Sequence, residues 1–359
     1  MKDTLANRLE TLQAAFDKEG LSGLILNQGA YVYHLTDWLP PSWATIFAVV
    51  GSGELILVTP FVPEGIEPVW SAAITTEDTV AGLEQALSQA RMLGGPLGVV
   101  MGAFPAANAL PLSGQVELRD ATDLMYDVTA AKDEVAQQAI RERVSYLDKA
   151  FEVAKTAIKP GVSETAVFGA IFTSLAQSLG GTLTLDCNFG SGPRTLGNEP
   201  EPTNKLLEAG EVVMIDLFPV MGGYVADYTR NFVVGKPTDD QLAQHATLER
   251  ALAAGESILR PGTKASEIDQ LVRKTLEDEG WGEFAYQHHT GHAFGLTIPE
   301  PPWLLPDVDM PLRAGMVIAV EPGIYHPANG GMRLEGNYII TEDGPESLVG
   351  FPARLIACE

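Results

Sequence analysis

The feature that most constrains this chain is a ten-residue segment that occurs twice, at residues 207–216 and 312–321. Each copy reads Leu-x-Ala-Gly-x-Val, continues with apolar residues and ends on one carboxylate, Asp216 or Glu321. The apolar residues are typical of buried strands, which predicts that the acids at their ends are buried too. A buried carboxylate is costly unless a positive group lies beside it. We therefore expect a cation, most simply a metal ion, between the two copies.

The first copy is followed by a glycine-rich turn and a second acid, which predicts a hairpin. Asp216 and Asp227 are symmetric about the link between Met221 and Gly222, so a hairpin that turns there places them directly opposite one another. Cross-strand neighbours on one face have Cβ atoms about 4.5–5.5 Å apart. Gly222 and Gly223 would supply the positive φ angles that such a turn needs.

The second copy predicts the same arrangement with a longer loop. Glu321 and Glu335 are symmetric about Ala328, and we expect Gly330 and Gly331 to provide the positive φ angles of that turn. The four carboxylates would carry about four negative charges, which two divalent ions would balance. The alternative is that one acid of each hairpin lies in solvent on an open face of a sheet.

Length and composition limit the class of protein. A chain of 359 residues predicts two domains. Its formal net charge of −24 argues against nucleic acid or an anionic membrane surface as a partner. No apolar run approaches the roughly 18 residues of a membrane helix. Cys187 and Cys358 are the only cysteines, which predicts a reducing cytoplasm and no disulfide framework; Cys187 could be a nucleophile, but an inert buried thiol is the commoner case.

Residues 1–125 have the pattern of a small N-terminal α/β domain. Helical periodicity gives way to short apolar strands separated by one further helix, which predicts helices at 3–18 and 78–93 and strands at 24–26, 46–50, 55–58 and 99–101. The polar stretch 120–133 is the expected linker. A long amphipathic helix follows at 133–158, and residues 126–359 form the predicted catalytic domain.

The second domain repeats more than the two segments. Pro160-Gly161 opens a helical stretch that ends at Gly180-Gly181, and Pro261-Gly262 opens another that ends near Gly280. Each half thus runs through a helix, a Pro-Gly turn, a second helix, strands and a hairpin with acids. The fold predicted is two α/β halves related by pseudo-two-fold symmetry, each contributing one hairpin to a central site.

A histidine cluster at residues 287–295 supplies a further ligand candidate. His288 and His292 have the i, i+4 spacing of a zinc-protease helix, but the glutamate of that motif is absent and Thr290-Gly291 is poor helix material. We therefore reject the single-zinc helix. One imidazole is expected to bind metal, and another to contact the substrate or a proton.

The motifs around these acids and His292 resemble those of the pita-bread metallopeptidases. They are Asp216; Asp-Tyr-Thr-Arg from Asp227; Thr-Gly-His-Ala-Phe-Gly around His292; Glu-Pro-Gly-Ile-Tyr from Glu321; and Met-Arg-Leu-Glu ending at Glu335. That family includes methionine aminopeptidase, aminopeptidase P, Xaa-Pro dipeptidase (prolidase) and creatinase. The resemblance implies a pita-bread fold for the second domain, and the N-terminal domain is similar to that of the prolidase, aminopeptidase P and creatinase branch.

The resemblance implies a two-metal centre. One ion would be held by Asp216, Asp227 and Glu335, and the other by Asp227, His292, Glu321 and Glu335. Carboxylates with one imidazole and no thiolate suit Mn, Co, Fe(II) or Zn. Two ions about 3.5–4 Å apart would bridge a water and activate it as hydroxide. In the family, the acid at Glu321 also shuttles the proton of that water toward the leaving nitrogen.

The chain departs from the family at two histidine positions. One is occupied by Pro299, and the other falls near Asn198-Glu199. Those histidines stabilise the oxyanion or position the substrate, so losing both could cost several kcal/mol of transition-state binding. His288 matches a third family histidine, which lies near the substrate and has a catalytic role in the proline-specific branch.

Other residues are expected to replace part of what is lost. His289 and His326 have no counterpart in the family, and we expect one of them, or a residue of the loop 194–201, to substitute for the missing imidazoles; His289 is the substrate-binding candidate. Arg333, two residues before Glu335 on the same strand face, is a candidate to bind a substrate carboxylate. Its alternative is a salt bridge to a neighbouring acid.

The leading hypothesis is a proline dipeptidase that cleaves Xaa-Pro with small peptides as substrates. It rests on the N-terminal domain, His288 and Arg333. Aminopeptidase P activity on longer Xaa-Pro peptides is the close alternative, and a creatinase-like C–N hydrolase or a binding protein with a degenerate site are more distant ones. A homodimer is implied by the resemblance alone.

Overall fold

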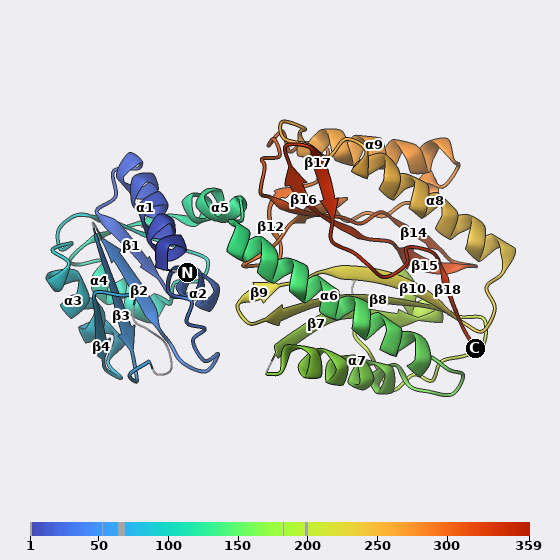
Figure 1. Ribbon diagram of the computed structural model, residues 1–359, viewed down its shortest axis with the longest axis horizontal. Helices are drawn as coiled ribbons and strands as arrows, with labels where there is room; N and C mark the ends of the chain where they lie inside the picture. The colour runs from blue at the N-terminus through green and yellow to red at the C-terminus, as the bar shows by residue number, and fades with distance from the viewer. Residues whose placement is uncertain (1, 52, 64–68, 182, 198–199) are drawn as a thin grey trace. The chain divides into compact units, whose positions relative to one another are not determined.

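The computed structural model describes residues 2–51, 53–63, 69–181, 183–197 and 200–359. The chain forms two compact units, Met1–Thr129 and Ala130–Glu359. Both contain sheets and helices, which confirms the mixed α/β class predicted from the sequence (Figure 1). None of the helices in the described ranges combines the length and apolar composition that crossing a bilayer requires.

The first unit is built on one sheet with the strand order β4-β3-β2-β1-β5-β6. Its strands are β1 (Gly23–Leu26), β2 (Phe47–Gly51), β3 (Glu54–Thr59), β4 (Ala72–Thr75), β5 (Pro96–Val99) and β6 (Glu117–Asp120). Its helices are α1 (Lys2–Lys18), α2 (Gly29–Thr36), α3 (Thr79–Gln89), α4 (Ala106–Leu112) and α5 (Thr122–Ala130). The central strands are apolar and almost wholly buried, so they form the core with the inner face of α3.

Two local predictions in this region need correction. The strand expected at 99–101 lies at Pro96–Val99, because Val100 begins the turn that leads into α4. The predicted linker 120–133 does contain the boundary between the two units, but most of it forms the helix α5. Asp120 accepts hydrogen bonds from the backbone N–H and the hydroxyl of Thr122 at the start of that helix, a helix-starting arrangement that composition alone did not reveal.

The second unit contains two larger sheets and a two-stranded ribbon. One sheet has the order β18-β10-β8-β7, with β9 beside β8, and the other has the order β12-β11-β13-β16-β17. The strands of the first are β7 (Leu183–Ser191), β8 (Val212–Met221), β9 (Tyr224–Val225), β10 (Tyr228–Val234) and β18 (Ile356–Cys358). Those of the second are β11 (Gly291–Ala293), β12 (Glu300–Trp303), β13 (Val317–Val320), β16 (Gly336–Thr341) and β17 (Gly344–Ser347). The ribbon pairs β14 (Gly323–His326) with β15 (Gly330–Arg333).

Four helices of this unit follow the predicted duplication. They are α6 (Glu134–Ala157), α7 (Glu164–Leu179), α8 (Asp239–Glu256) and α9 (Ala265–Asp278), and short 3-10 turns lie at η1 (Gly192–Leu196) and η2 (Gly282–Phe284). Within the first half, α6 packs on α7 and on β9 and β10, and it also contacts β18 from the end of the chain. Within the second, α8 packs on α9 and on β13, β14 and β15 (Figure 1). Each half therefore covers its own strands with its own pair of helices.

The two copies of the repeated segment are held in the same way. Leu207 O accepts a hydrogen bond of 2.9 Å from Gly161 N, and Leu312 O accepts one of 2.9 Å from Gly262 N. Both glycines have positive φ, at 82° and 91°, which the Pro-Gly turn requires. In each half the repeated leucine accepts a hydrogen bond from the Pro-Gly turn of that half, so the same backbone arrangement occurs twice.

The predicted register of the first hairpin is wrong by two residues. Asp216 lies opposite Thr229, and Asp227 falls in the break between β9 and β10. The reason is the turn: Gly222 and Gly223, with φ of 55° and 80°, are both central residues of a two-residue turn, so the hairpin folds between them. Asp227 is therefore released from the ladder.

The predicted register of the second hairpin is confirmed. β13 pairs with β16, and β14 pairs with β15, in the register that symmetry about Ala328 requires. Glu321 and Glu335 lie in the gap between these two ladders. Gly330 has a positive φ of 91°, as expected. Gly331 does not; a Cβ there would lie 2.1 Å from the carbonyl oxygen of Thr195, so it is needed for close backbone approach.

A buried ion pair ties the start of the second unit to the loop before β12. Lys132 Nζ donates to Glu300 Oε2 and to the carbonyl oxygen of Ala130, and both charged side chains are at most 3% exposed. The other oxygen of Glu300 accepts hydrogen bonds from Leu296 N and Thr297 N, each 2.9 Å long. The pair therefore holds the loop that carries Pro299.

Replacing Lys132 tests this role. Lys132→Met leaves the Glu300 carboxylate buried without a counter-charge, so we expect the free energy of unfolding of the second unit to fall by about 3–5 kcal/mol. Urea unfolding should show a lower midpoint with an unchanged slope. The double variant Lys132→Met/Glu300→Gln, which removes both charges, should recover part of the loss. A single variant as stable as the parent would contradict this account.

Candidate metal centre

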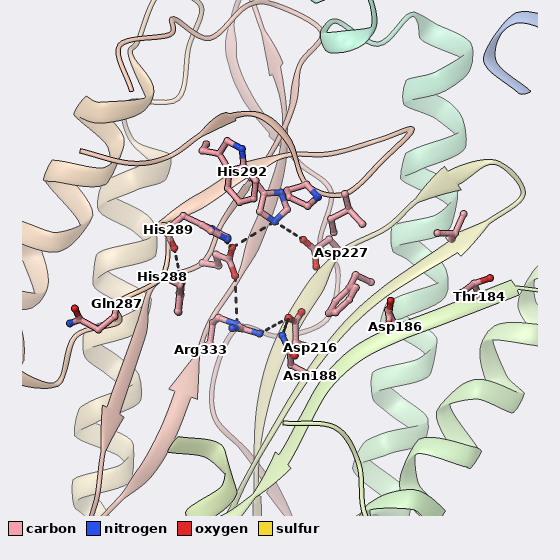
Figure 2. A pocket seen from close by; sticks show the side chains of 16 residues that line it. Thr184, Asp186, Asn188, Asp216, Asp227, Gln287, His288, His289, His292 and Arg333 are labelled. Atoms are coloured by element: carbon pink, nitrogen blue, oxygen red, sulfur yellow. Dashed lines mark hydrogen bonds and ion pairs between the residues drawn. The ribbon is translucent and has the colours of Figure 1, made fainter. Parts of the chain in front are cut away.

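A cavity of about 440 Å³ in the second unit brings together most of the predicted site residues. Its wall includes Asp216, Asp227, His288, His289, His292, Glu321 and Arg333, together with Pro299 and a stretch of β7 and β8 (Figure 2). Glu335 is 1% exposed and lies within ligand distance of the two aspartates, behind the surface of the cavity. The volume is in the range of small-molecule sites.

Three carboxylates meet at this cavity: one from the middle of β8 and two from breaks between strands. Asp216, Asp227 and Glu335 each offer an oxygen within 4.8 Å of the others, and all three are buried. Burial, followed by repulsion among the acids, raises the pKa of Asp227 and of Glu335 well above the ordinary value. The protein alone therefore disfavours ionisation of these carboxyls, which is the condition under which a bound cation is favoured.

His292 completes a second group of ligands. Its Nε2 lies 3.3 Å from Asp227 Oδ2 and 3.7 Å from Glu321 Oε1 (Figure 2). Its Nδ1 lies 2.9 Å from the carbonyl oxygen of Ala293, so Nδ1 carries the proton and donates it there. The lone pair of Nε2 then faces two carboxylates, an arrangement that repels without a cation and suits metal coordination.

Unpartnered buried oxygens support the same conclusion. Asp216 Oδ1 and Glu321 Oε1 are buried and lack a hydrogen-bond partner within the described ranges. Buried polar atoms are normally bonded, so each unpaired one needs a cause. Carboxylate oxygens with one neutral imidazole form a donor set that fits Mn, Co, Fe(II) or Zn. The residues present therefore fit divalent metal ions.

Neutral side chains fix the orientation of the carboxylates. Thr229 Oγ1 donates to Glu335 Oε2 at 3.0 Å, Asn337 Nδ2 donates to Glu335 Oε1 at 2.9 Å, and Asn188 Nδ2 donates to Asp216 Oδ2 at 3.3 Å. Such contacts orient metal ligands. Sequence reasoning missed these three residues. A polar residue within a buried strand was a usable signal for Thr229 and Asn337, but Asn188 lies in the half-exposed part of β7.

Arg333 forms the salt bridge that the sequence left open as an alternative. Its Nη2 donates to Asp216 Oδ2, and its Nε lies 3.6 Å from Glu321 Oε2 (Figure 2). The guanidinium is buried and its pKa is raised, because the attraction of these acids outweighs the cost of burial. Arg333 thus neutralises part of the cluster's charge while one side of it lines the cavity.

The three other histidines that the sequence singled out as candidates have different surroundings. Burial lowers the pKa of His288 to about 4, so its ring is neutral; Nδ1 contacts the carbonyl oxygen of His289 at 2.7 Å and Nε2 contacts Tyr325 Oη at 3.0 Å. His289 Nδ1 lies 3.0 Å from Glu321 Oε1 without hydrogen-bond geometry. His326 packs against aromatic rings, the nearer being Phe284 at 4.4 Å between centroids, and does not line the cavity.

The other positions that the sequence singled out are Cys187, Pro299 and Asn198-Glu199. Burial raises the pKa of the Cys187 thiol to about 12, and the residue is not part of the cavity wall, so no thiolate is available. Pro299 lines the cavity where the family carries histidine. Asn198-Glu199 lies outside the described residues.

Known proteins are similar to this chain in sequence and in fold. The profile of metallopeptidase family M24 matches residues 138–342. The chain is 29% identical to the probable dipeptidase PepE of Mycobacterium bovis, over 99% of this chain and 96% of that protein. It is 30% identical to the Xaa-Pro dipeptidase of Pyrococcus horikoshii, over 67% of this chain and 68% of that protein. The solved structure of a prolidase from Pyrococcus horikoshii has a TM-score of 0.86 and 25% identity, covering 98% of this chain and 100% of that one.

Metal binding should be measurable without any substrate. At a free metal concentration about 100 times Kd, Mn²⁺ or Zn²⁺ should stabilise the protein by about 2.7 kcal/mol, and a chelator should remove that gain in thermal unfolding. Glu335→Gln should lose most bound metal by elemental analysis. Glu342→Gln makes the same change of charge at an exposed position and should keep it. Full metal content in Glu335→Gln would contradict the proposed centre.

Proposed function

The chain belongs to metallopeptidase family M24, and from this premise we propose that it is a dipeptidase that hydrolyses the bond between an N-terminal residue and proline. Family membership confirms the resemblance noted in the motifs, and the likeness to solved structures confirms the pita-bread fold. The observation that carries the proposal is the cluster of Asp216, Asp227, Glu335, Glu321 and His292 at one small cavity. Near-full-length similarity to a probable dipeptidase supports it further.

We assign two ions to this cluster. One would be held by Asp216, Asp227 and Glu335, and the other by Asp227, His292, Glu321 and Glu335. When bound, such ions polarise the substrate carbonyl and lower the pKa of water so that it can attack. The donor set accepts Mn, Co, Fe(II) or Zn and does not select among them.

We propose Glu321 as the group that moves the proton. Burial alone would raise its pKa, but the adjacent His289 and Arg333 outweigh burial and lower it, so the carboxylate is ionised. Its Oε2 lies near Arg333, while its Oε1 lies toward the two imidazoles. We propose that this carboxylate accepts the proton of the attacking water and passes it to the leaving nitrogen.

His289 and His288 are proposed to contact the substrate in place of the missing imidazoles. His289 lines the cavity, but its Nδ1 is buried 3.0 Å from Glu321 Oε1, so we propose that the other ring nitrogen meets a substrate oxygen. The ring is held by Trp303, with centroids 4.8 Å apart. His288 also lines the cavity, and its Nε2 contacts Tyr325 Oη at 3.0 Å, which fixes the ring. Arg333 is the further candidate to bind a substrate carboxylate.

A homodimer and a cytoplasmic location stay predictions, the first drawn from the family resemblance and the second from the cysteine content.

Peptide length tests the dipeptidase proposal. With metal restored, we expect kcat/KM for Ala-Pro to exceed that for Ala-Pro-Ala by about tenfold or more, a difference of roughly 1.4 kcal/mol in transition-state binding. A chelator should abolish both activities. The reverse ranking would point to aminopeptidase P activity, and turnover of N-methylated amines alone would point to a creatinase-like hydrolase.

The histidine proposal predicts a selective loss of turnover. Replacing His288 and His289 together by alanine should lower kcat by about 10²-fold or more, the usual effect of removing a donor to the oxyanion. His326→Gln changes a histidine that lies off the cavity and should leave kcat within about twofold. Metal content and thermal unfolding should be measured alongside. Unchanged turnover in the double variant would refute a role for these rings.

A further inference from the structure

The strands β7 and β8 form one wall of the cavity with three successive cross-strand pairs. Their antiparallel register places residues of the two strands directly opposite one another, and both members of each pair line the cavity: Asn188 with Asp216, Asp186 with Phe218, and Thr184 with Val220. Figure 2 shows Asn188, Asp186 and Thr184 in this order away from Asp216. The wall therefore leads outward from the metal cluster in regular steps.

Asp186 is a carboxylate that the proposed mechanism does not use. It lines the cavity, is exposed, and has no hydrogen-bond or ion-pair partner among the residues that the structure describes. The acids of the metal cluster are buried, so the exposed Asp186 stands apart from them. Directly opposite it lies Phe218, half-buried, and one step further out lies Val220, 39% exposed. A free negative charge thus adjoins an apolar strip.

The spacing of the wall decides which part of a peptide can reach Asp186. Two residues along a strand advance the chain by about 6.6–6.8 Å, so Asp186 lies one such step beyond Asp216. The α-amine of a substrate is within about 3 Å of the scissile carbonyl and stays at the level of the metal cluster. An extended lysine side chain carries its amine about 6 Å from its Cα, from five bonds of roughly 1.5 Å.

We propose that Asp186 makes the enzyme prefer a lysine or arginine as the N-terminal residue of its substrate. The aliphatic part of that side chain would lie along Phe218 and Val220, and its cation would pair with the Asp186 carboxylate beside the Phe218 ring. This inference rests on the proposed function, because it takes the scissile bond to lie at the metal cluster.

Matched dipeptides separate charge from length. Lys-Pro and norleucyl-Pro have side chains of similar reach, and only the first is charged. In the parent enzyme we expect kcat/KM for Lys-Pro to be about three- to fivefold higher, as for an exposed ion pair, and to fall with added salt. Asp186→Asn should abolish this ratio, mainly through KM, and leave norleucyl-Pro within about twofold. Asp240→Asn, an exposed acid in the first turn of α8, should keep it.

A binding measurement keeps the test independent of hydrolysis. Analogues of both dipeptides with the scissile carbonyl reduced to CH2 cannot be cleaved, and calorimetry on the metal-loaded protein should give the same ratio of Kd values, lost in Asp186→Asn. Equal weakening of both analogues would place Asp186 on the peptide backbone and overturn the inference, as would no change in either. If neither dipeptide is hydrolysed, the proposed function fails, while the Kd ratio still decides the role of Asp186.

Discussion

The crowding of four buried carboxylates is the constraint on which the rest of the second unit depends. Asp216, Asp227, Glu321 and Glu335 are buried together, and the guanidinium of Arg333 contacts two of them. Like charges at such distances repel strongly in a medium of low dielectric constant. The fold must hold them in place against that repulsion, and the orphaned oxygens and the lone pair of the nearby imidazole show where cations would relieve it. Rigid strands and hydrogen-bonded neutral partners provide the restraint.

The internal duplication provides this rigidity, because both halves use the same local structure. The two halves use the same hydrogen bonds between a repeated leucine and a Pro-Gly turn, and each half covers its strands with two helices. The halves then diverge in what they supply. The first contributes Asp216 and Asp227 together with the β7–β8 wall, and the second contributes His292, Glu321 and Glu335. Each half supplies only part of the ligand set, so the centre can form only when both halves are folded against each other.

The loop before β12 differs from the family at one position of the cavity wall, and this difference changes the polarity of the site. Where the family carries a histidine, this chain has Pro299, next to Glu300, whose charge is taken up by Lys132. The cavity wall gains an apolar residue and loses a hydrogen-bond donor at that position. His289, which lines the same cavity just before β11, is the replacement that we propose, and the substrate contact would then come from this segment and not from the loop.

The sequence by itself determined the positions of the four acids and the histidine, the long helix α6, and the register of the second hairpin, because these follow from local periodicity and from turn symmetry. It misjudged the first hairpin by two residues, since the pair Gly222-Gly223 could fold at either of two points and only the completed sheet selects one. Only the tertiary structure decided that Arg333 pairs with Asp216, that Lys132 meets Glu300 far along the chain, and that Asn188, Thr229 and Asn337 orient the acids. Periodicity records which face of an element is buried, whereas the partner of each buried group depends on how distant elements pack, and no local pattern carries that information.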